Sequence, residues 1–113
     1  MSHPDLVKKY GHVPSFDARP LYEQAAEAAA AGGVMVEVNT SGAHYACREM
    51  FPCPDFLRAL CRAGVPCTVG TDAHEVGHVA RGVEEAYRLM WEAGYRTVTV
   101  PQRDGSRREI ALG

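Results

Sequence analysis

Short runs of β-branched residues alternate with helix-forming segments along almost the whole chain, and glycines mark the boundaries between them. Strands that alternate with helices are typical of parallel β/α units, in which each helix returns the chain to the start of the next strand. The sequence therefore predicts an α/β fold. The expected helices cover residues 20–31, 54–63 and 83–93, the expected strands cover 34–39, 65–71 and 97–100, and a short antiparallel strand at 109–112 follows the turn signal Asp104-Gly105.

Apolar residues recur at helical spacing within each expected helix and predict the face that packs on the core. Asp17 is expected to cap the first helix. Asp5, near the N-terminus, is expected to cap the turn that directly follows Asp5 itself. The predicted inward residues are Leu21, Ala25, Ala28 and Ala29 in the first helix, Phe56, Leu57, Leu60 and Cys61 in the second, and Val83, Ala86, Tyr87, Met90 and Trp91 in the third.

Length, charge and cysteine spacing exclude several classes of protein. The 113 residues allow one domain, and a net charge of -2 without a long block of like charge argues against a nucleic-acid partner. No signal peptide is visible, and charged residues and glycines interrupt the most apolar stretch, so no membrane span is expected. The four cysteines form no C-x-x-C pair, which argues against a zinc ribbon. The sequence around them alternates helix and strand patterns, unlike a small disulfide-rich scaffold, so we expect a cytoplasmic protein with reduced thiols.

Functional groups gather at the carboxyl ends of parallel strands. Asp72 and His74 directly follow the second expected strand, two residues apart. Residues at that spacing in extended backbone point the same way, so a carboxylate and an imidazole could both reach one metal ion such as zinc, manganese or iron. The alternative is that Asp72 caps the next turn and His74 is a solvated loop residue.

Other candidate residues lie at the N-terminus and in the long loop at residues 40–52. His3 is a metal-ligand candidate if a strand precedes it, and otherwise a surface residue; the abrupt start suggests a chain cut from a longer one. The candidate substrate-binding residues are Arg48, His44 and Lys9, with a solvated loop arginine as the alternative for Arg48. Glu37, on an otherwise apolar strand, needs a partner and suits a structural role or the support of a metal ligand.

Four motifs in order resemble the C-terminal half of the polymerase and histidinol phosphatase (PHP) family, and its histidinol-phosphatase branch most closely. The similarity covers nearly all of the chain between His3 and Val100. The motifs are His3-Pro4-Asp5-Leu6-Val7-Lys8-Lys9-Tyr10, Glu37-Val38-Asn39-Thr40-Ser41-Gly42, Pro52-Cys53-Pro54-Asp55-Phe56-Leu57 and Val69-Gly70-Thr71-Asp72-Ala73-His74.

This resemblance implies the C-terminal portion of a distorted (β/α)7 TIM-like barrel with up to three divalent metal ions at its mouth. It implies hydrolysis of a phosphate monoester, histidinol phosphate, in histidine biosynthesis, with metals that activate water and neutralise the phosphate. By match of motif, His3, Asp72 and His74 take the places of metal ligands.

The chain also departs from the family pattern. The family's His-x-His motif and further ligands are absent, and three side chains cannot hold three metals. The loop after Gly42 carries Ala43-His44-Tyr45 where the family usually offers basic residues, which leaves the phosphoester open. We therefore expect an incomplete phosphatase with little activity alone and a small phosphorylated substrate. The alternatives are a non-catalytic barrel remnant that self-associates through exposed edges, or a PHP enzyme for another phosphoester.

Overall fold

Two parallel strands, β1 (Val36–Asn39) and β2 (Cys67–Gly70), lie at the centre of the fold and pair in register from Val36 opposite Cys67 to Asn39 opposite Gly70. The computed structural model describes residues 1–113. Since both strands end at the same edge, the segments that follow Asn39 and Gly70 start side by side.

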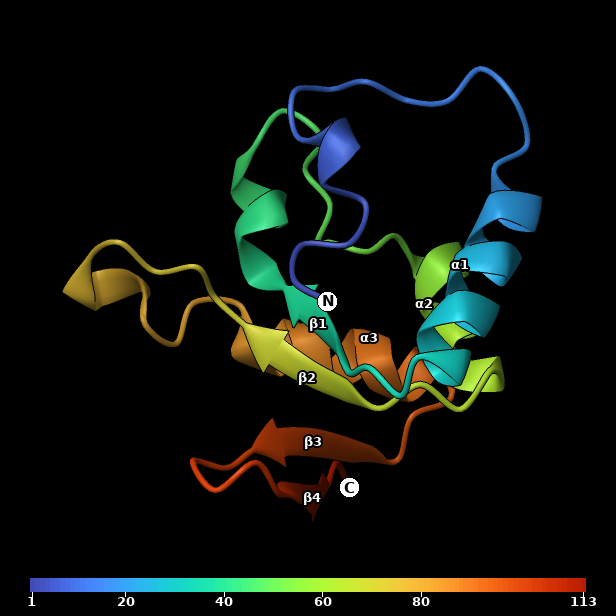
Figure 1. Cartoon of the computed structure of the whole chain (residues 1–113). Coiled ribbons are helices and arrows are strands. Elements are labelled where there is room, and N and C mark those ends of the chain that lie inside the picture. Colours follow the sequence, from blue (N-terminus) through green and yellow to red (C-terminus); the bar gives the residue numbers. More distant parts are fainter.

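Three helices accompany this sheet: α1 (Arg19–Ala31), α2 (Pro54–Arg62) and α3 (Val83–Ala93). Helices α1 and α2 lie against one another on one side of the molecule, and α3 lies behind the sheet (Figure 1). Tyr22 of α1 stacks on Phe56 of α2 with ring centroids 4.8 Å apart. The predicted helices and their order are therefore confirmed, with ends that differ by one residue at most.

A hairpin completes the chain: β3 (Thr97–Pro101) and β4 (Arg107–Ala111) pair antiparallel. The Asp104-Gly105 turn is confirmed, because Gly105 adopts a positive φ of 84° and Asp104 accepts hydrogen bonds from the backbone N–H and hydroxyl of Ser106. β3 lies beside β2 without ladder hydrogen bonds, so the strands form two separate two-stranded sheets.

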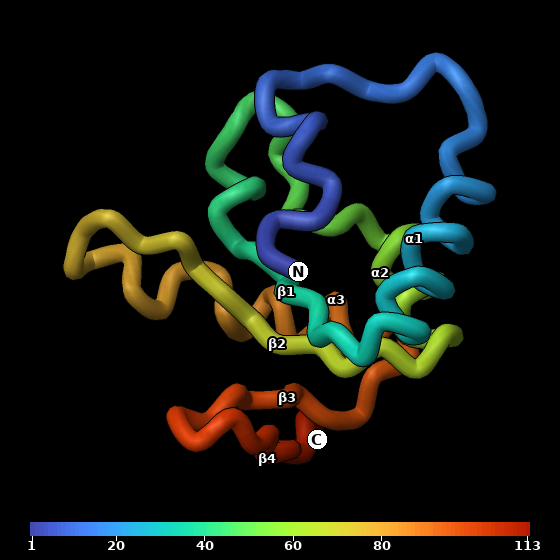
Figure 2. The backbone as a smooth tube through the Cα atoms, in the orientation of Figure 1, coloured from blue at the N-terminus to red at the C-terminus, as the bar shows by residue number.

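Three short 3-10 helices shape the edge where β1 and β2 end: η1 (Leu6–Lys8), η2 (Thr40–His44) and η3 (Val76–His78). The N-terminal backbone runs beside β1, where the Met1 amine donates to the carbonyl of Met35 and the Met1 carbonyl accepts from Glu37 N–H. The tube in Figure 2 shows this N-terminal segment beside β1 and the loop that carries η3 extending away from the sheet.

The core forms between the sheet and the helices. Val36, Val38 and Leu60 are fully buried, and the Tyr95 hydroxyl donates to the carbonyl of Val65 at 2.8 Å. All four cysteines are free thiols, as expected.

Two predicted helix faces are partly wrong. In α1, Leu21 is half exposed while Ala26 is buried, because the helix rolls so that Tyr22 reaches Phe56. In α3, Tyr87 and Trp91 lie outside. Trp91 packs instead against the Arg96 guanidinium, 4.0 Å from the ring centroid.

Further predictions also differ in detail. The first and second strands each begin two residues later than expected, since Val34 is exposed and β2 starts at Cys67. Ala28, predicted inward in α1, is exposed.

The structure shows a mixed α/β fold with one parallel strand pair, and the barrel stays a prediction. No helix has both the length and the apolar character needed to cross a membrane.

Candidate functional site

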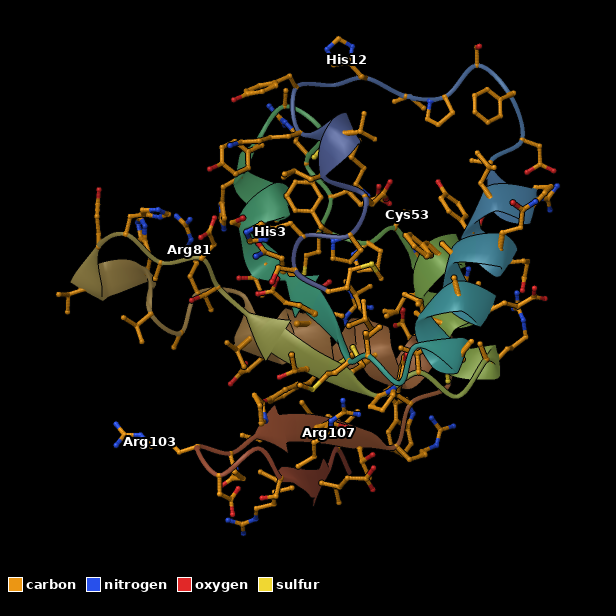
Figure 3. The ribbon with its side chains drawn as sticks, in the orientation of Figure 1. His3, His12, Cys53, Arg81, Arg103 and Arg107 are labelled. Atoms are coloured by element: carbon orange, nitrogen blue, oxygen red, sulfur yellow. The ribbon has the colours of Figure 1, made fainter.

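The site predicted from sequence divides into two clusters at the edge where β1 and β2 end. His3 contacts residues of β1, whereas Asp72 and His74 lie on the loop after β2. Figure 3 shows His3 at the end of β1 and Arg81 on the loop that follows β2. Across the whole described chain, no three His, Cys, Asp or Glu side chains gather as a metal ion requires.

Glu37 folds across Gly70 to reach His3. A Cβ built on Gly70 would fall 1.8 Å from Glu37 Oε1, so only glycine leaves room for the carboxylate at this position of β2. Glu37 Oε2 accepts the backbone N–H of His3 at 3.1 Å and lies 3.4 Å from the His3 ring nitrogen Nδ1. The partner that the sequence required for Glu37 is therefore the His3 segment, which adopts the left-handed region with φ 45°.

Asn39 connects His3 to the loop after β1. Its side chain is fully buried, and Nδ2 lies 2.7 Å from His3 Nδ1. Oδ1 accepts the Ser41 backbone N–H at 3.0 Å and the Ser41 hydroxyl at 2.5 Å. A buried amide that makes these contacts holds the N-terminal segment and η2 together. Sequence reasoning placed Asn39 at the end of the strand but did not predict that it connects His3 to the following loop. The available signal was an amide side chain at the end of a parallel strand.

Asp72 and His74 share an exposed loop after β2. The prediction that Asp72 and His74 lie in extended backbone and therefore point the same way is wrong. β2 ends at Gly70, and Asp72 adopts a left-handed φ of 50°. The two residues still interact, since His74 Nδ1 lies 2.7 Å from the Asp72 carbonyl oxygen. A carbonyl only accepts, so Nδ1 carries a proton, and in the neutral imidazole Nε2 then keeps a free lone pair.

That arrangement suits metal ligation, because metal-binding histidines commonly donate the other ring N–H to a carbonyl. Asp72 and His74 therefore provide donors of the right chemistry. They do not form a metal centre by themselves, because a structural or catalytic ion needs at least one further protein ligand.

Thr40 and Gly82 tie the loop after β2 to the end of β1. The Thr40 hydroxyl donates to the Arg81 carbonyl at 2.7 Å, and Gly82 lies with φ 79° close to Thr40. The returning end of the Asp72 loop is therefore held next to η2.

The predicted substrate-binding residues do not gather around one pocket. Lys9 Nζ lies over the ring of Tyr45, 4.2 Å from its centroid. His44 is exposed at the end of η2. Arg48 lines a hollow of about 270 Å³ that Glu49 and Glu85 also line, and these carboxylates disfavour a phosphate there.

An ion cluster around the buried Lys8, which sequence reasoning missed, fixes the N-terminal segment. Lys8 Nζ lies 2.9 Å from Asp5 Oδ2 and 2.6 Å from Glu49 Oε2, and Lys8 is 7% exposed. Asp5 also accepts the backbone N–H of Cys53 at 3.0 Å. The predicted capping role of Asp5 is wrong, because its carboxylate faces Lys8 and Cys53 and makes no cap hydrogen bond.

Asp17 lies one residue before the N-cap of α1, which is Ala18. Its carboxylate nevertheless accepts the backbone N–H of Arg19 at 3.1 Å, so it satisfies one donor of the first helical turn as expected.

Comparison with known proteins gives one informative similarity. The chain is 36% identical over 104 residues to a protein of Deinococcus radiodurans named probable histidinol-phosphatase. Along nearly its whole length, the chain resembles this phosphatase. The match covers 91% of this chain and 39% of the relative. No protein-family model matches the chain.

Proposed function

We propose that the chain is part of a phosphoesterase of the histidinol-phosphatase type and that its substrate is a small phosphate monoester. The similarity to the Deinococcus radiodurans protein carries this proposal, because it extends over 91% of the chain. The chain spans 39% of that relative's length, so the proposal concerns a portion of such an enzyme. The proposed reaction, hydrolysis of a phosphate monoester, makes the enzyme a hydrolase.

We further propose that Asp72 and His74 are metal ligands. His74 keeps its Nε2 lone pair free while Nδ1 donates to the Asp72 carbonyl, and the side chains of both residues are exposed on the same loop. A bound divalent ion would lower the pKa of a water molecule and neutralise phosphate charge. No third donor lies with these two in the structure. We propose that His3, which the motif match also places at a metal ligand, and residues outside this chain would supply the remaining ligands.

Metal binding by the chain tests the role of Asp72 and His74. We expect calorimetric titration with manganese or zinc to show weak binding that Asp72→Asn and His74→Gln each abolish. His12 is exposed and makes no side-chain hydrogen bond or ion pair, so it provides the matched control, and His12→Gln should leave binding unchanged. Binding that persists in both loop variants would contradict the assignment.

A phosphatase assay tests the reaction itself. Histidinol phosphate and an unrelated phosphate monoester should be compared with added manganese or zinc. We expect the 113-residue chain alone to release little phosphate. Robust turnover by this chain would contradict the proposal that its site is incomplete.

Exposed apolar side chains near the N-terminus favour a second candidate, a module that self-associates. Val7, Tyr10, Val13 and Phe16 are each more than half exposed. Exposed apolar surface favours association with a second copy. Light scattering coupled to size-exclusion chromatography should then give the mass of a dimer for the unaltered chain. The double variant Tyr10→Ser/Phe16→Ser should give the mass of a monomer. A monomer mass for the unaltered chain would refute this candidate.

A further inference from the structure

The loop after β2 returns to the sheet at Arg81, and two contacts hold this residue beside the end of β1. The Thr40 hydroxyl donates to the Arg81 carbonyl at 2.7 Å, and Thr40 is 1% exposed. Gly82 lies so close that an added Cβ would come 3.0 Å from the Thr40 Cβ. The backbone of Arg81 is therefore fixed next to η2, just before α3 begins at Val83.

The Arg81 guanidinium has no partner within the chain. Four other arginines pair with carboxylates: Arg19, Arg58, Arg62 and Arg88. The side chain of Arg81 makes no ion pair and donates no hydrogen bond to the protein, although the residue is half-buried. Since a guanidinium carries five N–H donors in a planar fork, Arg81 keeps its full capacity for an acceptor from outside the chain.

Position and surroundings distinguish Arg81 from the other cations near the ends of the strands. Figure 3 shows Arg81 at the end of the sheet where His3 also lies. Arg48 shares its hollow with two carboxylates, and Lys9 lies over an aromatic ring. Arg81 pairs with neither kind of group, and it lies on the same loop as Asp72. It is therefore the cation at this end of the sheet that is best placed to take an anion.

We propose that Arg81 binds the phosphate group of the substrate through its guanidinium fork, and that Thr40 is the positioning residue that fixes Arg81 for this contact. A guanidinium binds phosphate through two parallel N–H···O bonds, which attract the group and also orient it. A fixed backbone reduces the conformational entropy that is lost on binding. A phosphate ester as the ligand rests on the proposed function, whereas the binding of inorganic phosphate by Arg81 does not.

Titration of the full chain with inorganic phosphate, without metal, tests the contact. In ¹H–¹⁵N spectra, the Arg81 Nε–H signal, assigned by its loss in Arg81→Lys, should shift with phosphate. Calorimetry should show that Arg81→Met weakens phosphate binding about tenfold or more, because the variant lacks hydrogen bonds between charged partners. Arg103→Met provides the matched control, since Arg103 is an exposed arginine without an ion pair on the turn between β3 and β4 (Figure 3).

Three results of this titration would overturn the proposal. The first is an Arg81 signal that phosphate leaves unmoved in the unaltered chain. The second is phosphate binding that Arg81→Met does not weaken. The third is an equal loss in Arg81→Met and Arg103→Met, because such a result would reflect net charge alone.

Variants of Thr40 test its positioning role. Thr40→Val removes the hydroxyl with little change in volume, and Thr40→Ser keeps the hydroxyl. We expect Thr40→Val to weaken phosphate binding and Thr40→Ser to leave it nearly unchanged. In an Arg81→Met background, Thr40→Val should cause no further loss, because the group that Thr40 positions is absent. An equal loss in both backgrounds would show that Thr40 does not act through Arg81.

Histidinol phosphate and histidinol, titrated separately, show whether Arg81 takes the phosphate of an ester. Arg81→Met should weaken the binding of histidinol phosphate and leave any binding of histidinol unchanged. Binding of histidinol phosphate that Arg81→Met leaves unchanged would overturn this proposal and leave the proposed function standing. Binding of inorganic phosphate through Arg81 without binding of histidinol phosphate would do the reverse.

Discussion

Replacing Gly70 with alanine isolates the close approach between β2 and Glu37. The added Cβ would lie 1.8 Å from Oε1 and 2.7 Å from Cδ of Glu37, so the carboxylate must swing away from His3. Gly70 does not adopt a positive φ, and the substitution therefore adds no backbone strain. The expected damage is confined to the Glu37 carboxylate and the bond it accepts.

The size of the effect follows from two opposing contributions. A hydrogen bond to a charged group contributes about 1.5–3 kcal/mol. Replacing a glycine in a strand returns about 0.5–1 kcal/mol through lower backbone entropy in the unfolded chain. We therefore expect Gly70→Ala to lower the free energy of unfolding by about 1–2 kcal/mol, from the difference of these two contributions.

Urea denaturation of a double-mutant cycle measures this effect. In a Glu37→Ala background, the side chain that the added Cβ would meet is absent. There Gly70→Ala should leave the free energy of unfolding unchanged or raise it slightly. Gly77→Ala provides the control, because a Cβ there meets no atom within 4 Å. An equal cost of Gly70→Ala in both backgrounds would refute the steric account of Gly70.

Three further predictions concern other parts of the chain. Lys8→Met should lower the free energy of unfolding by about 3 kcal/mol, because it leaves the buried Asp5 carboxylate without its cation. Burial lowers the pKa of Lys8, but its bonds to Glu49 and Asp5 outweigh this and leave the pKa raised. The advantage of the unaltered chain over Lys8→Met should therefore be complete at neutral pH and disappear as the pH rises through the folded pKa of Lys8, which denaturation at several pH values can follow. Burial raises the pKa of the Cys67 thiol to about 12, so iodoacetamide at pH 8 should alkylate Cys67 last of the four cysteines, as mass spectrometry can record; early modification of Cys67 would contradict its burial. Gly42→Ala places a Cβ 2.3 Å from the backbone carbonyl of Glu49, which cannot rotate away, so thermal melting should show a larger loss than Gly70→Ala, about 3 kcal/mol or more.

Periodicity and glycine boundaries were enough to predict the three α-helices and the four strands, because these signals are local, but they did not predict the three 3-10 helices. They failed for Tyr87 and Trp91, which are partly exposed. Trp91 lies next to Gly113 at the end of the chain instead of in the core, and no local pattern encodes that contact. Helical spacing identifies an apolar face but not which part of that face another element will cover.

The candidate site was less predictable than the fold. Sequence position identified the ends of the strands: Asn39 is the last residue of β1, and Asp72 follows the end of β2 at Gly70 by two residues. The contacts between His3, Glu37 and Gly70 join residues more than thirty positions apart, and no local pattern encodes them. The left-handed backbone of Asp72 likewise depends on how the loop after β2 returns to Thr40.

The central claim is that this chain supplies part of a phosphoesterase site through Asp72 and His74. A phosphatase assay on histidinol phosphate with added manganese tests this claim. The assay mixes this chain with the part of the Deinococcus radiodurans relative that lies outside the matched region. We predict little release by either component alone, and release by the mixture that Asp72→Asn abolishes. A mixture that releases no phosphate, or that releases it equally with Asp72→Asn, would contradict the claim.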